Sequence, residues 1–566
     1  MLNLEISRIF YEIADILEIK EVEWKPRAYR NAARSIESLT KDVKEIYKNE
    51  GLKGLQEIPG IGEALALKIE EYIKTGKIHE YEKLKSSMPK GFSELMNVSG
   101  LGPKKIRKLY KELDIKNVSD LQKAIQKRKL ENLYGFGEKT EENIFKSIEL
   151  LKESKKRFLL GIAYPIATSV KEKLQKLKEV NQVEIAGSLR RMQETIGDVD
   201  ILVTSANHKK VIETFVKFPE VKRILAKGET RASVILEEDI QCDLRVVNQN
   251  QFGSALQYFT GSKDHSIALR KIAIKKGYKL SEYGLFKGKK VVASRTEKEI
   301  YNKLGFPYIE PELRENRGEL IKKIPKIISY NEIKGDLHIH TKATDGTASI
   351  LEMANAAKSL GHEYIAITDH SKSSAIVNGL SESQLLKQIE EIKNLNKKIK
   401  GIKILSGSEV NILKNGDLDY SENILKKLDV VLIGIHNGFK MSKQDMTKRI
   451  LNALDNENAN ILVHPTGRLL NHRIPYEVDL NKIFKFCSDN NKILEIDSSF
   501  DRLDLNDINI KRAIENGVKL VIDTDSHSVK SLNNIKYGIA QARRGWCTSK
   551  DIVNTLPLNK LLKELK

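Results

Sequence analysis

Seven short apolar segments, each followed directly by polar residues, occupy the last part of the chain from about residue 333. Helix-like stretches lie between them, and this alternation is typical of parallel β/α folds. The segments read GDLHIHT, YIAITDHS, KILSGSEV, VVLIGIHN, ANILVHPTG, KILEIDSS and KLVIDTDSHS. Seven repeats favour a sheet closed into a barrel, so the polar clusters mark the end where barrels of this kind carry their chemistry.

Histidines and carboxylates gather at these segment ends. Six of the 11 histidines of the chain lie there, although each of them taken alone is more often structural. Imidazole and carboxylate without thiolate suit Zn²⁺, Mn²⁺ or Fe²⁺, and nine ligands are too many for one ion. The candidate ligands are His338, His340, Asp345, His370, Glu409, His436, His464, Asp525 and His527. We therefore predict a cluster of three ions, which activates water and neutralises a phosphate.

The length and charge of the chain narrow its class. A chain of 566 residues is too long for one hydrophobic core. A formal net charge of +20 attracts polyanions such as nucleic acid, although a lysine-rich solvated surface gives the same charge. Three separated cysteines exclude a disulfide framework or a thiolate zinc site. Without a signal peptide or a membrane-spanning segment, we expect a cytoplasmic, nucleoid-associated protein with no membrane partner.

Three glycine hairpins recur in the first 150 residues, whose pattern is otherwise helical. A G-x-G turn lets backbone N–H groups approach a phosphate, and the next helix adds the positive end of its dipole. One such turn carries little weight, but three in a basic region resemble helix-hairpin-helix elements, which hold DNA through its phosphates. The candidate DNA contacts are Gly60, Gly62, Gly100, Gly102, Lys104, Lys105, Gly135, Gly137 and Lys139.

A second group of carboxylates lies in the middle of the chain. In GDVDILV, Asp198 and Asp200 stand two residues apart on a predicted strand and so share one face. A neighbouring predicted strand, IQCDLRVV, offers Asp243. Three convergent carboxylates hold two Mg²⁺ ions, which suits attack of a hydroxyl on phosphorus. A D-x-D pair alone is common, but here it follows Gly187, Ser188 and an arginine pair suited to a triphosphate.

This order of motifs resembles a family X DNA polymerase over roughly residues 1–316. The motifs are GS, then DVD, then the strand with a single aspartate, then YFTGSKDHSIALRKIA. The resemblance implies a lyase-like domain followed by fingers, palm and thumb-like subdomains that add dNTPs at short gaps. It also implies that Asp198 and Asp200 bind both metals, and that Asp243 binds the catalytic metal and helps activate the primer 3′-OH.

Further contacts follow from the same resemblance. The residues that match nucleotide contacts are Gly187, Ser188, Arg191, Gly197, Tyr258, Phe259, Gly261, Ser266 and Arg270. Two positions depart from the pattern, since Ser266 stands where the family often has Asn, and Gln241 where some members have Arg. These departures bear on fidelity and sugar selectivity and leave the metal site unchanged.

The segment RAYRNAARSI, residues 27–36, matches the lyase-like domain of the same family. Active members remove 5′-deoxyribose phosphate through a lysine Schiff base. By position along the first hairpin Lys68 falls at that lysine, with Lys25 and Tyr29 as supporting groups. The alternative is that Lys68 is one of many ordinary lysines.

The C-terminal segment resembles the PHP (polymerase and histidinol phosphatase) family over roughly 333–566, with all nine ligands matched. A family X polymerase followed by PHP is the arrangement of bacterial and archaeal family X polymerases. In that group the PHP domain is associated with 3′→5′ exonuclease and with abasic-site or 3′-end processing. Arg468, just after HPTG, reaches either a substrate phosphate or the surface.

We therefore expect a multidomain protein with an α-helical N-terminal helix-hairpin-helix region, an α+β nucleotidyltransferase palm and a C-terminal (β/α)7-like PHP barrel. The expected units are 1–80 (lyase-like), 81–150 (fingers-like), 151–250 (palm), 251–316 (thumb-like), 317–332 (linker) and 333–566 (PHP). The expected partners are gapped or nicked DNA and dNTPs, acting on a monomer with Mg²⁺ in the palm and Mn²⁺ or Zn²⁺ in the barrel.

The leading hypothesis is a gap-filling repair polymerase with a PHP nuclease. One alternative is primarily a PHP nuclease whose polymerase half positions DNA, and another is a binding module with a structural metal. Intact palm carboxylates and nine preserved ligands disfavour these two. A small-molecule phosphatase is disfavoured by the attached DNA-binding half.

Overall fold

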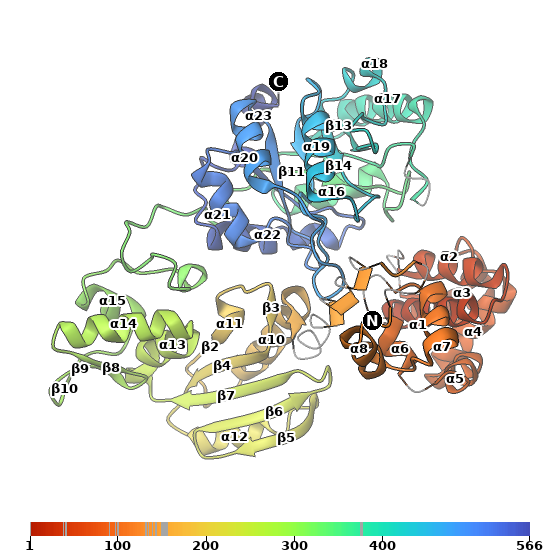
Figure 1. Cartoon of the computed structure of the whole chain (residues 1–566). Coiled ribbons are helices and arrows are strands. Elements are labelled where there is room, and N and C mark those ends of the chain that lie inside the picture. Colours follow the sequence, from red (N-terminus) through yellow and green to blue (C-terminus); the bar gives the residue numbers. More distant parts are fainter. Residues whose placement is uncertain are drawn as a thin grey trace.

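The computed structural model describes residues 2–37, 39, 42–89, 91–96, 98, 101–130, 133, 135–137, 140–141, 144–145, 147–148, 157–373 and 377–565. Figure 1 shows helices in the N-terminal part, a sheet-containing middle part and a strand–helix barrel in the C-terminal part. Within the described ranges, none of the helices is long and apolar enough to cross a membrane.

The N-terminal part is helical and is built around two small cores. Its helices are α1 (Leu2–Ile19), α2 (Lys25–Glu37), α3 (Val43–Gln56), α4 (Glu63–Thr75), α5 (His79–Ser86), α6 (Phe92–Met96), α7 (Pro103–Leu113) and α8 (Val118–Gln126). In α1 the apolar side chains recur every three or four residues, and Ile6, Phe10 and Ile13 are fully buried against α2 to α5. A second core surrounds α7 and α8.

The middle part contains a five-stranded sheet with the strand order β2-β4-β7-β6-β5. Its strands are β2 (Gln182–Ile185), β4 (Asp198–Thr204), β5 (Val221–Lys227), β6 (Arg231–Leu236) and β7 (Gln241–Val247). The remaining elements are β1 (Phe158–Leu159), α10 (Leu160–Gln175), α11 (Gly187–Arg190), β3 (Thr195–Ile196) and α12 (His208–Phe215). Strands β4 and β7 run parallel, whereas β2, β5 and β6 pair antiparallel with their neighbours.

A small unit of helices and strands follows the five-stranded sheet, which forms the predicted palm. It comprises η1 (Gln249–Gln251), α13 (Phe252–Thr260), α14 (Lys263–Lys275), β8 (Lys279–Ser281), β9 (Gly284–Lys287), β10 (Lys290–Ala293) and α15 (Glu297–Lys303). The segment after it forms only η2 (Pro311–Leu313) before the barrel. Although this segment is irregular, its first part is packed: Arg314 is fully buried and binds Glu297, and Glu312 binds Arg543 of the barrel.

The C-terminal part is a parallel sheet of seven strands in sequential order. The strands are β11 (Gly335–Ile339), β12 (Tyr364–Ile367), β13 (Lys403–Asn411), β14 (Val430–Gly434), β15 (Ile461–Leu462), β16 (Ile493–Asp497) and β17 (Leu520–Asp523). A bridge between Ile339 and Ser526 joins the last strand region to the first, so the barrel is nearly closed. Each of the seven predicted segments contains one of these strands, which confirms the predicted fold class.

Helices surround these strands in the order expected of a β/α repeat. They are α16 (Ile350–Ser359), α17 (Glu382–Lys398), α18 (Glu422–Leu425), α19 (Lys443–Leu454), α20 (Leu480–Asp489), α21 (Asp507–Glu515), η4 (Ser531–Asn534), α22 (Ile535–Arg544), η5 (Val553–Thr555) and α23 (Leu558–Glu564). Local sequence sets their starts: capping boxes of Ser349 with Glu352 and of Ser381 with Gln384 begin α16 and α17.

Candidate active sites

Three carboxylates meet on the palm strands β4 and β7. The parallel register places Asp200 directly opposite Asp243, and Asp198 lies two residues earlier on the same face. Burial, together with the charges of Asp198 and Asp243, raises the pKa of Asp200 to about 7. Burial and the charge of Asp243 also raise the pKa of Asp198. Such mutual repulsion is relieved by divalent cations, so these oxygen donors fit a pair of Mg²⁺ ions.

Glycine is required beside this cluster. Gly187 has a φ of 62°, and a Cβ at this position would lie 2.1 Å from Asp200 Oδ2. A larger residue would therefore displace the Asp200 carboxylate. At Gly197 the nearest atom to an added Cβ is Arg157 Nη1 at 3.5 Å, so space does not demand glycine there.

Two side chains support Asp243. Gln241 Nε2 donates to Asp243 Oδ1 at 3.1 Å, and Arg231 Nη2 lies 3.2 Å from Asp243 Oδ2. Sequence reasoning missed Arg231, because it lies on β6 and only the sheet order brings it to the site. A cavity of about 220 Å³ adjoins these groups and is also lined by Asp200 and Phe259.

The predicted nucleotide contacts fall into two sets. Ser188 lies in α11 and Arg191 follows this helix, while Tyr258 and Phe259 lie near the end of α13. Gly261, with a φ of 69°, packs against the Arg191 guanidinium: an added Cβ would lie 3.2 Å from Arg191 Nη1. The structure therefore brings the ends of α11 and α13 together beside the carboxylates.

Ser266 and Arg270 form the second set, on α14. Arg270 Nε donates to the Ser266 carbonyl oxygen at 3.2 Å. Within the described ranges no hydrogen bond or ion pair joins either residue to the palm carboxylates. His265 on the same helix is fully buried between Glu319 and Tyr301, so its role is structural.

The hairpin glycines leave the helix starts open. Gly62 and Gly102 immediately precede α4 and α7, and an added Cβ at Gly62, Gly102 or Gly137 would meet nothing within 4 Å. Gly60 and Gly135 have φ values of 80° and 92°, which L-residues rarely adopt. This geometry suits phosphate bound to backbone N–H groups.

One of the hairpin lysines lies near a lysine of the barrel. Lys104 lies in the first turn of α7, and Lys105 Nζ lies 5.2 Å from the centre of the Phe136 ring. Burial, and then the charge of Lys440, lower the pKa of Lys105 to about 8. Lys440 follows His436 in the loop after β14, so Lys105 of the hairpin lies near this barrel loop. Two predicted DNA contacts lie outside the described residues: Gly100 and Lys139.

Lys68 lies on α4 in an ion pair. Its Nζ is 2.6 Å from Glu80 Oε2, and the Tyr29 hydroxyl donates to the same carboxylate at 3.3 Å. Burial alone would raise the pKa of Glu80, but Lys68 lowers it overall. Lys68 therefore has a structural partner, and Tyr29 joins the same cluster.

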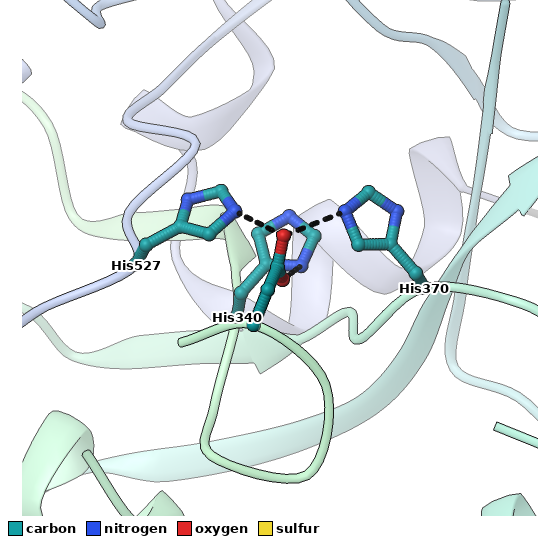
Figure 2. Close-up of side chains that lie close together, drawn as sticks. His340, His370 and His527 are labelled. Atoms are coloured by element: carbon teal, nitrogen blue, oxygen red, sulfur yellow. Dashed lines mark ion pairs between the residues drawn. The ribbon is translucent and has the colours of Figure 1, made fainter. Parts of the chain in front are cut away.

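All nine predicted barrel ligands meet near the carboxyl ends of the strands. Three subsets each place one ligand atom per residue within 4.8 Å of the others. They are His340, Asp345, His370 and His527; His338, His340 and Asp525; and His370, Glu409 and His436. Figure 2 shows that His340, His370 and His527 point toward one another. His464 completes the set, with Nε2 2.8 Å from Glu409 Oε1.

The charged groups of this cluster shift one another's pKa values. Although burial opposes it, the carboxylates of Glu409 and Asp345 raise the pKa of His370 to about 10. Burial lowers the pKa of His464 to about 4. Buried ligand atoms such as His338 Nε2 and both ring nitrogens of His340 have no hydrogen-bond partner among the described residues. Unpartnered imidazole nitrogens beside carboxylates fit transition-metal ions.

Sequence reasoning missed the residues that orient these ligands. Glu495 lies on β16, and its Oε1 is 2.6 Å from His338 Nδ1. Its Oε2 accepts a hydrogen bond from the His464 backbone N–H at 2.6 Å. Arg502 Nε lies 3.4 Å from Asp525 Oδ2 and 3.5 Å from Asp497 Oδ2. The signal was present, because the strand segment KILEIDSS carries two acids, Glu495 and Asp497, although it supplies none of the nine predicted ligands.

Arg468 lies at the contact between barrel and palm. It is 7% exposed, and its Nη2 lies 2.8 Å from Glu194 Oε2 of the palm. The pair shows that Arg468 joins the two parts of the molecule rather than facing solvent.

The sequence matches five known families along its length. They are the helix-hairpin-helix domain (residues 1–78), the SAM-like helix-hairpin-helix tandem (92–149), the DNA polymerase beta palm (163–260), the DNA polymerase beta thumb (255–315) and the PHP domain (336–499). These matches agree with the order of the parts seen in the structure.

Curated relatives match either the whole chain or one part. A Bacillus subtilis protein named DNA polymerase/3′-5′ exonuclease PolX is 36% identical over 99% of both chains. A probable phosphatase of Thermoanaerobacter sp. is 30% identical over 41% of this chain and 94% of its own. DNA polymerase lambda of Rattus norvegicus is 25% identical over 55% of this chain and 56% of its own.

Proposed function

Since the chain belongs to the family X DNA polymerases that carry a C-terminal PHP domain, we propose that it is a bifunctional DNA repair enzyme. The palm fills short gaps by template-directed addition of dNTPs, and the barrel hydrolyses phosphodiesters at primer 3′ ends. The observation that carries this proposal is the presence of two separate donor clusters in one chain, one of oxygen only and one rich in imidazole.

In the polymerase site, Asp198, Asp200 and Asp243 would hold two Mg²⁺ ions. Such a pair stabilises the attacking and leaving oxygens of an in-line displacement. Asp243 accepts a hydrogen bond from the primer 3′-hydroxyl. We assign the remaining nucleotide contacts to Gly187, Ser188, Arg191, Gly197, Tyr258, Phe259, Gly261, Ser266 and Arg270, with the arginine on the triphosphate and the α13 end against the sugar.

In the barrel, the nine ligands would hold three ions of Mn²⁺ or Zn²⁺. Metal ions of this kind activate water and neutralise phosphate charge. The loop after β14, which carries His436 and Lys440, leads the phosphate backbone from the α7 hairpin to the cluster. 3′→5′ exonuclease is the main activity that we propose, with abasic-site and 3′-end processing as further reactions of the same site.

The proposed substrate is gapped or nicked DNA, bound by a monomer associated with the nucleoid. The hairpin glycines together with Lys104, Lys105 and Lys139 hold the backbone, and dNTPs enter the palm. We propose the units 1–80, 81–150, 151–250, 251–316 and 333–566 as domains, joined before the barrel by residues 317–332.

A 5′-deoxyribose phosphate lyase at Lys68 is a separate proposal. If Lys68 forms a Schiff base, borohydride traps the protein on 5′-deoxyribose phosphate DNA, and Lys68→Ala abolishes trapping. Lys74→Ala is the matched control, because Lys74 lies on the same helix in an ion pair with Glu70. Equal trapping of wild type and Lys68→Ala would refute the assignment.

The decisive experiment is a labelled primer on a gapped template, with and without dNTPs. We expect extension when dNTPs are present and shortening when they are absent. Shortening alone would support a nuclease whose polymerase half positions DNA. Extension alone would leave the barrel as a structural metal domain, and hydrolysis of small phosphomonoesters alone would indicate a phosphatase.

A further inference from the structure

The turn at residues 191–194, which follows α11, belongs to the palm but is held by the barrel. Three barrel side chains bind it: Arg544 Nη1 donates to the Arg191 carbonyl oxygen at 2.7 Å, Gln541 Nε2 donates to the Met192 carbonyl oxygen at 3.3 Å, and Arg468 Nη2 lies 2.8 Å from Glu194 Oε2. Met192 has a φ of 52°, an unfavourable conformation for a residue other than glycine. Such a conformation persists where surrounding contacts enforce it.

The guanidinium of Arg191 is fixed within this arrangement. Its Nε donates to Glu315 Oε1 at 2.9 Å, and its Nη1 donates to the Thr260 carbonyl oxygen. The same Glu315 oxygen lies 3.1 Å from Arg544 Nη1. The side chains of Arg191 and Glu315 are each 12% exposed, and that of Arg544 is 2% exposed. The three groups therefore form a nearly buried ion cluster across the palm–barrel contact.

Arg544 also sets the charge of this cluster. Glu315 alone would neutralise Arg191 and weaken its attraction for an anion. Arg544 faces both Glu315 and Asp507, and Arg317 lies 2.8 Å from Asp507. Three arginines thus face two carboxylates, which leaves a net positive charge beside the palm.

We propose that Arg544 of the barrel is a positioning residue for nucleotide addition. Through Glu315 and the Arg191 carbonyl, it holds the Arg191 guanidinium in the orientation that receives the dNTP triphosphate, and its own charge keeps the surroundings of Arg191 positive. Fixing the guanidinium in advance lowers the ordering cost of nucleotide binding. This inference rests on the proposed assignment of Arg191 to the triphosphate. It gives the barrel a role in polymerisation that is separate from its metal cluster.

Arg544→Gln in the full-length protein tests the inference by steady-state kinetics on gapped DNA. We expect the KM for dNTP to rise about tenfold, which corresponds to the loss of about one charge-assisted hydrogen bond. The kcat should stay within about twofold of the wild-type value. The 3′→5′ exonuclease rate stays at the wild-type level, and Arg544→Lys recovers part of the KM because it restores the charge. Arg543→Gln is the matched control: this neighbouring arginine binds Glu312 and does not contact the turn.

A double-mutant cycle separates positioning from general destabilisation. If Arg544 acts through Arg191, adding Arg544→Gln to Arg191→Ala does not raise the KM for dNTP further, whereas independent effects would multiply. An unchanged KM in Arg544→Gln, or effects that multiply, would overturn the inference. If Arg191→Ala itself leaves the KM unchanged, the proposed triphosphate assignment fails instead. Equal falls in kcat and in exonuclease rate in Arg544→Gln would indicate misfolding. If Arg544→Lys, the milder substitution, shows the same equal falls, the positioning role is overturned.

Discussion

Asp200 carries the largest electrostatic penalty among the palm carboxylates. It lies opposite Asp243, and burial with its two acidic neighbours raises its pKa to about 7. Because the folded-state pKa lies above the ordinary value of 3.8, the fold is destabilised as the pH rises from 3.8 to about 7. The penalty is fully present above that range and is the natural counterpart of a cation site.

Asp200→Asn should therefore stabilise the metal-free protein at high pH. We expect the melting temperature in EDTA at pH 8 to rise by about 2–4 °C, and the gain to shrink as the pH falls toward 4. Asp239→Asn, an exposed carboxylate in the same part of the chain, is the control and should give no such trend. A gain that is independent of pH would contradict the electrostatic account.

Glu495 holds two of the residues that we propose as barrel ligands. Its two oxygens contact His338 and the backbone of His464. Glu495→Gln keeps the shape but removes the charge, so we expect metal content and exonuclease rate to fall about 10–100-fold while polymerisation is unchanged. Metal analysis of the purified variant checks this, and wild-type metal content would refute it.

The sequence pattern predicted nine candidate ligands that the structure brings together, but it did not predict the residues that support them, for a physical reason. Each ligand comes near the carboxyl end of its strand, and this end of a barrel is fixed by the fold. Glu495 and Asp497 alternate with Leu494 and Ile496 on β16, so their strand was predictable. Their partners, His338 and Arg502, depend on side-chain packing that periodicity does not encode.

At the scale of elements, the glycine hairpins are the clearest case in which local sequence sets local structure. Gly62 and Gly102 have φ values of −82° and −85°, so alanine fits the backbone at both sites. An added Cβ would meet no protein atom within 4 Å and would instead project where we propose that a phosphate binds.

The double variant Gly62→Ala and Gly102→Ala should therefore bind gapped DNA more weakly without losing stability. We expect about a tenfold higher Kd and a melting temperature within about 2 °C of wild type. Fluorescence anisotropy against salt concentration measures the change, with steep salt dependence in both proteins. Unchanged affinity would show that these turns do not contact DNA.

One strand lies outside the predicted pattern. The strand β5 was not predicted, because all but one of its residues are exposed and its apolar residues do not alternate. Pairing with β6, rather than local periodicity, decides its structure.

At the scale of the whole molecule, the two active sites lie on parts that are packed together. Phe500 of the barrel would clash with any Cβ at Gly161 of the palm, and Arg468 pairs with Glu194 across 274 positions of sequence. Contacts between residues so far apart in the chain cannot be predicted from one amino-acid sequence. This packing explains how Arg544 of the barrel contacts the turn after α11, while the carboxylates of the palm and the histidine-rich cluster of the barrel remain separate.

The central claim is that one chain holds two independent active sites, and a labelled primer on a gapped template tests it most directly. We expect Asp243→Asn to abolish extension, supported by Mg²⁺, and to keep 3′→5′ shortening, supported best by Mn²⁺ or a similar ion. His436→Ala should do the reverse, because losing one ligand costs orders of magnitude at its own site only. Loss of shortening in Asp243→Asn, with DNA binding unchanged, would contradict the account and assign the hydrolysis to the polymerase site.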